Sequence, residues 1–345
     1  MTQRLIAAVR TCAAGLVLLP LLIGAALAEA PTAAPAGGWR TEILRDHPLT
    51  GRLYDLTAER FADHVTVLDD LAGARFVLLG EKHDNPDHHA LQAEIVRRLG
   101  REDGFAAVVF EMLSPEQADA LPARGAAGVD LDALAQAIEW ETRGWPDWPA
   151  YRAIFAEALA ARMALRPGNP RREAVLATVR EGLAAAMDEA ERARFALDRP
   201  LDPADAARLL DQIEAAHCGY APRDRLAPMV DAQRLKDAAL ADALIAASAE
   251  DGPAVLIAGG GHVRRDWAAP LYLARRGAAE SRILLFVEVA PESEDPAAYA
   301  PRDSTGSPAA DYLWFTPRVD LDDPCARFAQ QLERMKTSGD PPAPE

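Results

Sequence analysis

Apolar runs of strand length recur along the chain and predict the core of a β-sheet. An unbroken apolar run that closes on glycine is typical of a strand buried on both faces, as in a parallel sheet. A shorter run at 163–165 fits one more strand. The clear runs cover residues 75–80, 106–110, 254–258, 282–289 and 311–315.

Segments with apolar residues at helical spacing lie between these runs. Residues 88–99 carry apolar positions at helical spacing between the first two runs, which predicts a βαβ unit with a right-handed crossover. From about 131 to 246 the chain is rich in Ala, Leu, Glu and Arg, and we expect helices to begin near Pro203 and Pro228. The pattern predicts an α/β fold: a mostly parallel mixed sheet flanked by helices, with a helical insert subdomain at about 131–246.

The first residues are typical of a secretory signal peptide. Arg4 and Arg10 precede the apolar stretch 13–27, and small residues up to Ala28 offer a cleavage site. The alternative is a membrane anchor, but this stretch is shorter than the roughly 20 residues that span a bilayer, and Pro20 interrupts it. We therefore expect export to the periplasm, cleavage near Ala28 and no stable membrane insertion of the mature chain.

The remaining segments are assigned by composition. A lead-in at 29–74 precedes an α/β domain at 75–325, and 326–345 form a C-terminal tail. The formal charge is −16, and removal of the two arginines of the signal peptide lowers it to −18. Such a surface repels phosphate backbones and anionic lipid, so nucleic acid is excluded as a partner.

Cysteine usage leaves one question open. Cys12 precedes the apolar stretch, whereas a lipoprotein cysteine follows it, so we expect no lipid anchor. Cys218 and Cys325 remain in the mature chain. In an oxidising compartment they could pair, or they could be two separate buried thiols, because sequence does not show how closely they approach.

Glutamate and histidine follow three of the predicted strands. Glu81 and His83 come after the first, Glu111 follows the second, and His262 follows three glycines after the strand at 254–258. The carboxyl ends of parallel strands meet at one edge of a sheet, where ligands bind in open α/β folds. We therefore expect these four side chains to converge. Taken singly, each has a structural alternative: a helix-capping loop, a buried carboxylate on backbone N–H groups, or a glycine hinge with an incidental histidine.

Imidazole with carboxylate suits two kinds of chemistry. His83, His262 and Glu111 could hold zinc or another divalent metal. Glu81, His83, Glu111 and His262 could also form the acid–base site of a hydrolase. His217 lies where a helix ends at glycine and is either a ligand or a helix-terminal histidine.

Six segments, in order over residues 75–290, carry a family resemblance: 79–89 with Gln92, 110–112, 143–148, 216–219, 229–233 and 259–266 with Pro270. Trp145 and Trp148 belong to one of these segments and could contact a flat ligand or pack in the core. Together the segments resemble the ChaN family of bacterial haem-binding proteins, which is related to the group containing the erythromycin esterases, TraB and the Tiki metalloproteases.

The resemblance implies haem binding, a role in iron or haem acquisition at the cell envelope with possible transport components, dimer formation and a tyrosine ligand to iron. Tyr151, Tyr220 and Tyr272 lie near the matching segments. Two hypotheses follow: a haem carrier that is not an enzyme, which we favour, and a metal-dependent or His/Glu hydrolase. Our candidate haem contacts are Glu81, His83, His217, Tyr220, His262 and Arg265.

Overall fold

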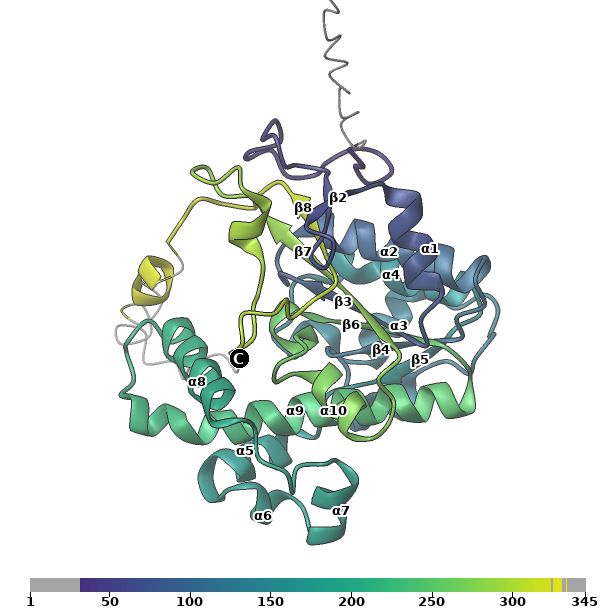
Figure 1. Ribbon diagram of the computed structural model, residues 1–345. Coiled ribbons are helices and arrows are strands. Elements are labelled where there is room, and N and C mark those ends of the chain that lie inside the picture. The colour runs from purple at the N-terminus through teal and green to yellow at the C-terminus, as the bar shows by residue number, and fades with distance from the viewer. Residues whose placement is uncertain (1–31, 324, 331–332, 334–345) are drawn as a thin grey trace, which may run out of the picture.

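Alternating side chains of the central strands explain why helices cover both faces of the sheet. In β3 (Phe76–Glu81), Phe76 and Leu78 enter one apolar cluster while Val77 and Leu79 enter another, and all four are fully buried. A strand with two apolar faces must be covered on both sides. The computed structural model describes residues 32–323, 325–330 and 333 and has this layered arrangement (Figure 1).

The described residues form an eight-stranded sheet in the order β2-β1-β8-β7-β3-β6-β4-β5. The strands from β8 to β5 pair in parallel, and β1 and β2 add an antiparallel edge. The predicted mostly parallel mixed sheet is confirmed. The strands are β1 (Leu53–Asp55), β2 (Arg60–Ala62), β3, β4 (Ala107–Phe110), β5 (Ala164–Pro167), β6 (Ala254–Gly259), β7 (Ser281–Glu288) and β8 (Tyr312–Thr316).

All six apolar runs predicted from the sequence form strands of this sheet, β3 to β8. The strands β1 and β2, inside the segment taken as a lead-in, had not been expected. Each is three residues long, and none of the residues of β2 is fully buried, so neither carries a periodic signal. The helical insert also contributes β5 to the sheet edge, next to β4.

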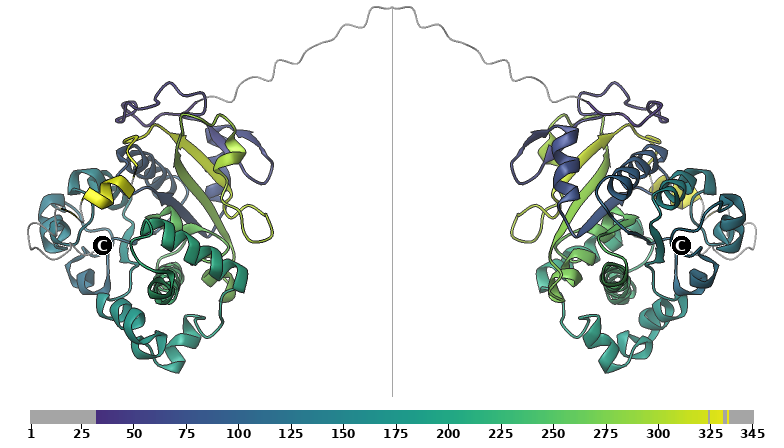
Figure 2. Two further views of the ribbon diagram at one scale, coloured as in Figure 1. Left: turned by 90° about the vertical axis from the view of Figure 1, so that its left-hand side faces the viewer. Right: turned by 90° about the vertical axis from the view of Figure 1, so that its right-hand side faces the viewer.

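Helices α1 to α4 cover one face of the sheet, and α9 and α10 cover the other, while α5 and α6 pack against α9 (Figures 1 and 2). The α-helices are α1 (His64–Ala72), α2 (Pro86–Arg101), α3 (Leu131–Ala137), α4 (Trp148–Ala160), α5 (Arg172–Glu181), α6 (Leu183–Ala186), α7 (Glu189–Arg194), α8 (Pro203–Ala216), α9 (Arg223–Glu250) and α10 (Ala269–Arg275). The 3₁₀ helices are η1 (Pro115–Ala120), η2 (Trp140–Thr142), η3 (Gly260–Val263) and η4 (Pro296–Tyr299).

Two helix starts test the capping signals. Helix α8 begins at Pro203, as predicted, and the side chain of Asp202 accepts a hydrogen bond from the N–H of Ala204. The start predicted at Pro228 is wrong: α9 begins five residues earlier, with Pro222 as its N-cap and Pro228 inside it. Pro228 is the sixth residue of α9, so the helix lacks the one hydrogen bond that an N–H at this position would donate to the carbonyl of Asp224.

The predictions for the two ends of the chain fall partly outside the described residues. This holds for the signal peptide at 1–28 and for most of the tail at 326–345, of which residues 326–330 are helical. Cys218 and Cys325 form a disulfide with a Cα–Cα distance of 5.4 Å, which resolves the open question in favour of pairing. Among the described helices, none is long and apolar enough to cross a membrane.

Candidate functional site

The predicted residues meet at the carboxyl ends of three neighbouring strands, with β6 between β3 and β4. Glu81 ends β3 and lies opposite Gly259, the last residue of β6, while Glu111 directly follows β4. Nε2 of His83 lies 3.8 Å from Oε2 of Glu111, and Nε2 of His262 lies 3.1 Å from Oε1 of Glu111. The four side chains therefore form one cluster, as expected from the sequence.

The loop after β3 holds His83 in place because it is capped at both ends. Asn85 is the N-cap of α2, and its side chain accepts hydrogen bonds from the N–H groups of Asp87 and His88. Nδ1 of His88 accepts from the N–H of Lys82 at 2.9 Å, and burial lowers the pKa of His88 to about 3. The capping role that we had considered for this loop is thus real, and it belongs to Asn85.

Glu81 points toward the face covered by α2 and α4. Its Oε1 lies 2.9 Å from Nδ1 of His83 and accepts a hydrogen bond from the hydroxyl of Tyr151, while Oε2 lies 3.3 Å from Nε2 of His89. Burial acts to raise the pKa of Glu81. The charge of His89 and the hydrogen bond from His83 outweigh it, so the pKa is lowered and the carboxylate is ionised.

Glu111 points toward the opposite face, where α9 lies. Its Oε2 accepts the N–H of Gly259 at 2.8 Å, and its Oε1 faces His262. Nδ1 of His262 in turn lies 2.6 Å from Oδ1 of Asp237, a fully buried residue of α9. Burial acts to lower the pKa of His262, but the two carboxylates outweigh it and raise the pKa to about 10. His262 is therefore a cation at neutral pH.

His83 crosses the edge of the sheet and joins the two halves of the cluster. Its side chain is 34% exposed, and its ring packs edge-on against Trp145, with centroids 5.2 Å apart. Burial acts to lower the pKa of His83, and the carboxylates of Glu81 and Glu111 raise it overall. Gly259 makes this position accessible, because a Cβ there would lie 2.7 Å from Nε2 of His83.

The metal-ligand hypothesis for His83, His262 and Glu111 finds no support. No group of three or more His, Cys, Asp or Glu side chains in the described part of the chain is arranged to hold a metal ion. The physical reason is that the polar atoms face one another: both ring nitrogens of His262 face carboxylates, and Nδ1 of His83 faces Glu81. A metal needs such lone pairs to be free.

Three other candidate residues lie apart from the cluster. His217 is the C-cap of α8, with Nδ1 2.7 Å from the carbonyl oxygen of Ile213. Tyr220 is 55% exposed in the turn between α8 and α9. Arg265 is engaged elsewhere, with one guanidinium nitrogen 2.8 Å from both carboxylate oxygens of Asp311.

Sequence reasoning did not place four further residues in the cluster or its support: His89, Asp237, Gln233 and Tyr151, the last of which it named only as a possible iron ligand. The side chain of Gln233 lies beside the imidazole of His262, with its Nε2 3.1 Å from Nδ1. A usable signal existed for two of them. Gln233 and Asp237 are four residues apart and therefore share one face of α9, and Asp237, like Arg234, is a charged residue among the otherwise apolar buried positions of this helix.

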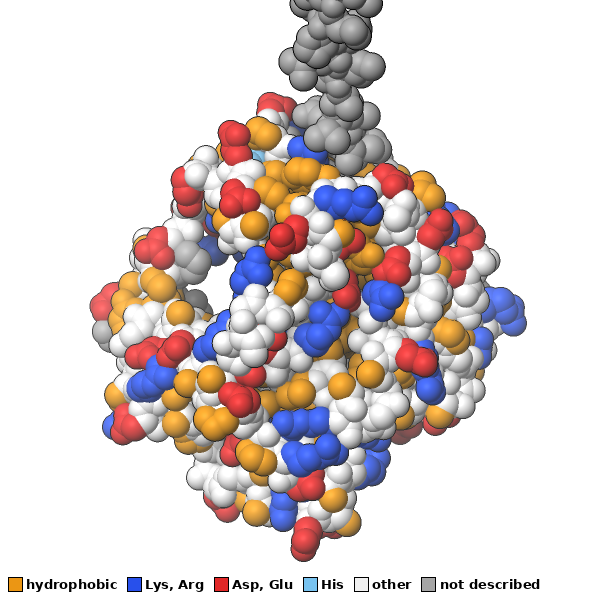
Figure 3. Space-filling model, in the orientation of Figure 1, with side chains coloured by type: hydrophobic (Ala, Val, Ile, Leu, Met, Phe, Trp, Pro, Cys, Tyr) orange, Lys and Arg blue, Asp and Glu red, His pale blue; other side chains and the backbone are white. Residues whose placement is uncertain are grey.

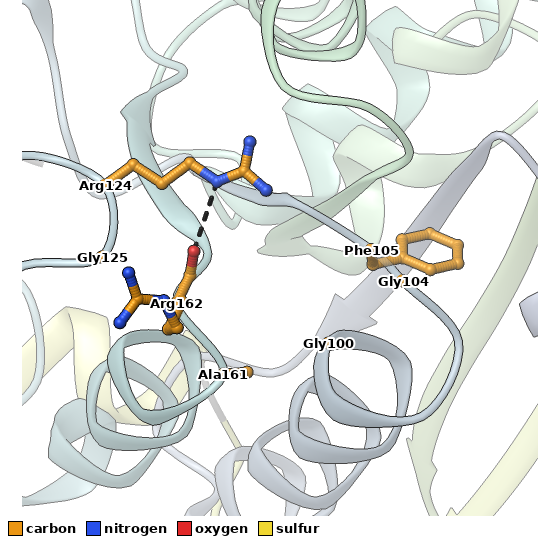
Figure 4. A pocket seen from close by; sticks show the side chains of 7 residues that line it. All are labelled: Gly100, Gly104, Phe105, Arg124, Gly125, Ala161 and Arg162. Carbon is orange, nitrogen blue, oxygen red and sulfur yellow. Dashed lines mark hydrogen bonds between the residues drawn. The ribbon is translucent and has the colours of Figure 1, made fainter.

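A surface pocket of about 510 Å³ lies at the opposite edge of the sheet, where β4 and β5 begin (Figure 4). Nε of Arg124 donates to the carbonyl oxygen of Arg162 there, at 3.3 Å. The lining holds no histidine or carboxylate, so it does not compete with the cluster as a place for acid–base chemistry. The lining residues are Gly100, Gly104, Phe105, Arg124, Gly125, Ala161 and Arg162.

The class of this protein is an α/β protein with a mostly parallel sheet and a cluster of histidines and carboxylates across three adjacent strand ends. A match to a family model identifies the family within that class. The chain belongs to the family described as haem-binding uptake, Tiki superfamily, ChaN, whose model matches residues 67–273. The resemblance noted in the sequence is thereby confirmed, and the family supports haem binding or handling.

One solved structure shares the fold. It is described as cofacial heme binding to ChaN of Campylobacter jejuni, is 18% identical and covers 76% of this chain and 95% of its own, with a TM-score of 0.59. Two others are more distant. The type III effector HopBA1 is 15% identical over 73% and 92% of the two chains, with a TM-score of 0.39. A mutant of the erythromycin esterase EreC in its open conformation is 14% identical over 83% and 87%, also with a TM-score of 0.39. No curated protein matches the sequence.

Proposed function

We propose that this protein binds haem through Tyr220 and handles it at the cell envelope. Family membership supports haem as the ligand. The observation that carries the proposal is the exposure of Tyr220. Of the six tyrosines in the sequence, all within the described residues, it is the exposed one.

The other tyrosines near the family segments are unsuitable as iron ligands. Tyr151 is fully buried and donates its hydroxyl to Glu81, and burial with the charge of Glu81 raises its pKa. Tyr272 is fully buried beside Arg234, and burial raises its pKa to about 12. An iron ligand must be a phenolate that the haem can reach, which leaves Tyr220.

The surroundings of Tyr220 fit a flat amphipathic ligand. Haem sites combine an axial ligand with apolar contact and partners for the propionates. Leu321, in the C-terminal segment that the disulfide ties to the Tyr220 turn, is 59% exposed. Arg225, five residues after Tyr220, is exposed, and no described hydrogen bond or ion pair engages its guanidinium. Figure 3 shows a hollow on the side of the molecule where α8 and residues 325–330 lie.

Within this proposal, Tyr220 would hold the haem iron through its phenolate oxygen, Leu321 would shield the haem from water, and Arg225 would pair with a propionate. Glu81, His83, His217, His262 and Arg265 contribute no ligand in this scheme. The cluster residues are engaged with one another, His217 caps a helix, and Arg265 pairs with Asp311. Export by the predicted signal peptide and dimer formation on haem binding complete the proposal.

Titration of the full chain with ferric haem tests it. We expect a saturable Soret shift with the wild type. The Tyr220→Phe substitution should raise the dissociation constant for haem at least 10-fold and abolish the phenolate charge-transfer band. The matched control is Tyr299→Phe, because Tyr299 is half-buried and donates to the carbonyl of Ser293. Equal affinities of wild type and Tyr220→Phe would contradict the proposal. Cell fractionation and gel filtration with haem test the location and the dimer.

The cluster supports a second candidate function, a metal-free hydrolase. The observation that favours it is the geometry of His83: Nδ1 is oriented by Glu81, and the ring is partly exposed beside Glu111. An imidazole oriented by a carboxylate is the arrangement of a general base that activates water. Hydrolysis of p-nitrophenyl esters, lost in His83→Gln and kept in His217→Gln, would support it. If the protein hydrolyses none of these esters, of short or long acyl chain, faster than buffer alone, the hydrolase function is excluded.

A further inference from the structure

The disulfide joins two segments that are far apart in the sequence. Cys218 lies in the turn between α8 and α9, and Cys325 begins the helical residues that follow β8, at a sequence separation of 107. Tyr220 is two residues beyond Cys218. Its ring packs edge-on against Phe328, three residues beyond Cys325, with centroids 5.4 Å apart. One covalent bond and one ring contact therefore tie the Tyr220 turn to the same C-terminal segment.

The disulfide and the ring contact join residues 325–330 to the Tyr220 turn. The described hydrogen bonds and ion pairs of residues 321–330 stay within the segment 318–330, as in the ion pair of Arg327 with Asp320. The nearest described hydrogen bond to the body of the protein is at Val319, whose N–H donates to Glu288. Once the disulfide opens, the packing of Tyr220 on Phe328 has no covalent support.

The turn also has an unusual backbone. Cys218 has φ of +53° and Gly219 has φ of +71°, so two consecutive residues are left-handed, the first of them not glycine. A left-handed residue with a side chain is uncommon and persists where its surroundings hold it. Here the Cys218 side chain is held by its bond to Cys325.

We propose that the Cys218–Cys325 disulfide positions Tyr220 for haem and that its reduction by a dithiol releases the haem. This inference rests on the proposed function. In the reaction, a thiolate of the dithiol attacks one sulfur, and the S–S bond breaks through a mixed disulfide. Two electrons and two protons pass to the cysteines, and the dithiol becomes a disulfide. Both cysteines are partly exposed and can be reached by such a reagent.

The test compares haem affinity in the two redox states of the full chain. We expect dithiothreitol to weaken haem binding at least 10-fold, with two additional thiols per chain detected by labelling. The double variant Cys218→Ser, Cys325→Ser should bind as weakly as the reduced wild type and should not respond to dithiothreitol. That insensitivity separates opening of the disulfide from any action of the reagent on haem itself or on Cys12. Circular dichroism checks that the variants are folded.

A further variant tests the positioning of Tyr220 without changing either cysteine. Phe328→Ala leaves the disulfide in place and removes the ring contact, so we expect weaker haem binding and a shifted Soret maximum in the oxidised protein. Equal haem affinity of oxidised and reduced wild type, with the thiols detected, would overturn the inference and leave the haem function standing. No Soret change even in the oxidised wild type would instead overturn the haem function itself.

Discussion

Nε2 of His262 lies 3.1 Å from Oε1 of Glu111, and the other nitrogen of the same ring lies 2.6 Å from Asp237. A buried imidazolium thus stands between two buried carboxylates that come from a strand end and from a helix. This pairing connects the sheet to α9. It makes His262 a structural cation as well as a neighbour of the partly exposed His83.

Replacement of His262 by Asn should destabilise the fold by about 3–5 kcal/mol, because it leaves two buried carboxylates without their counter-charge. Urea unfolding measures the free energy of unfolding directly. His217→Asn is the matched control, since His217 caps a helix end and is half-buried, and we expect it to cost about 1 kcal/mol or less. A His262 variant as stable as wild type would show that the carboxylates are not ionised.

The same pairing predicts a pH dependence. The pKa of His262 is raised from 6.5 to about 10, so its contribution to stability is complete below pH 6.5 and is lost as the pH rises toward 10. The difference in melting temperature between wild type and His262→Asn should therefore be large near pH 7 and small at pH 10. Thermal melts of both proteins across this range check it, and a difference that grows with pH would have the wrong sign.

Gly259→Ala should disturb the cluster, because a Cβ at this position would come within 2.7 Å of Nε2 of His83. We expect a loss of about 1–3 kcal/mol in stability and a changed pKa of His83 in an NMR titration. Gly260→Ala is the control, because its Cβ would meet Leu285 at an ordinary 3.4 Å. If both variants behave alike, His83 is not packed against Gly259.

Tyr151→Phe removes the hydroxyl that donates to Glu81 and keeps the ring. A hydrogen bond to a charged group contributes about 1.5–3 kcal/mol, so the variant should lose stability of that order by urea unfolding. Haem affinity should remain as in the wild type, since Tyr151 is buried. A variant that keeps its stability and loses haem would instead identify Tyr151 as the iron ligand.

Most of the sheet could be predicted because its strands are buried on both faces and therefore leave continuous apolar runs. The same logic placed Glu81, Glu111 and His262 at one edge, since carboxyl ends of parallel strands coincide. It could not reveal His89, Tyr151 or Asp237 as partners. These residues come from helices whose rotation against the sheet depends on packing over long sequence distances.

The sequence by itself determined the strands β3 to β8, the family and which strand ends carry chemistry, because these properties are local in the chain. The tertiary structure decided the rest. Alternation along the strands sends Glu81 and Glu111 to opposite faces, so that His83 must cross the sheet edge to join them. It also left Tyr220 exposed and brought Cys218 to Cys325, because exposure and proximity depend on how all elements pack together.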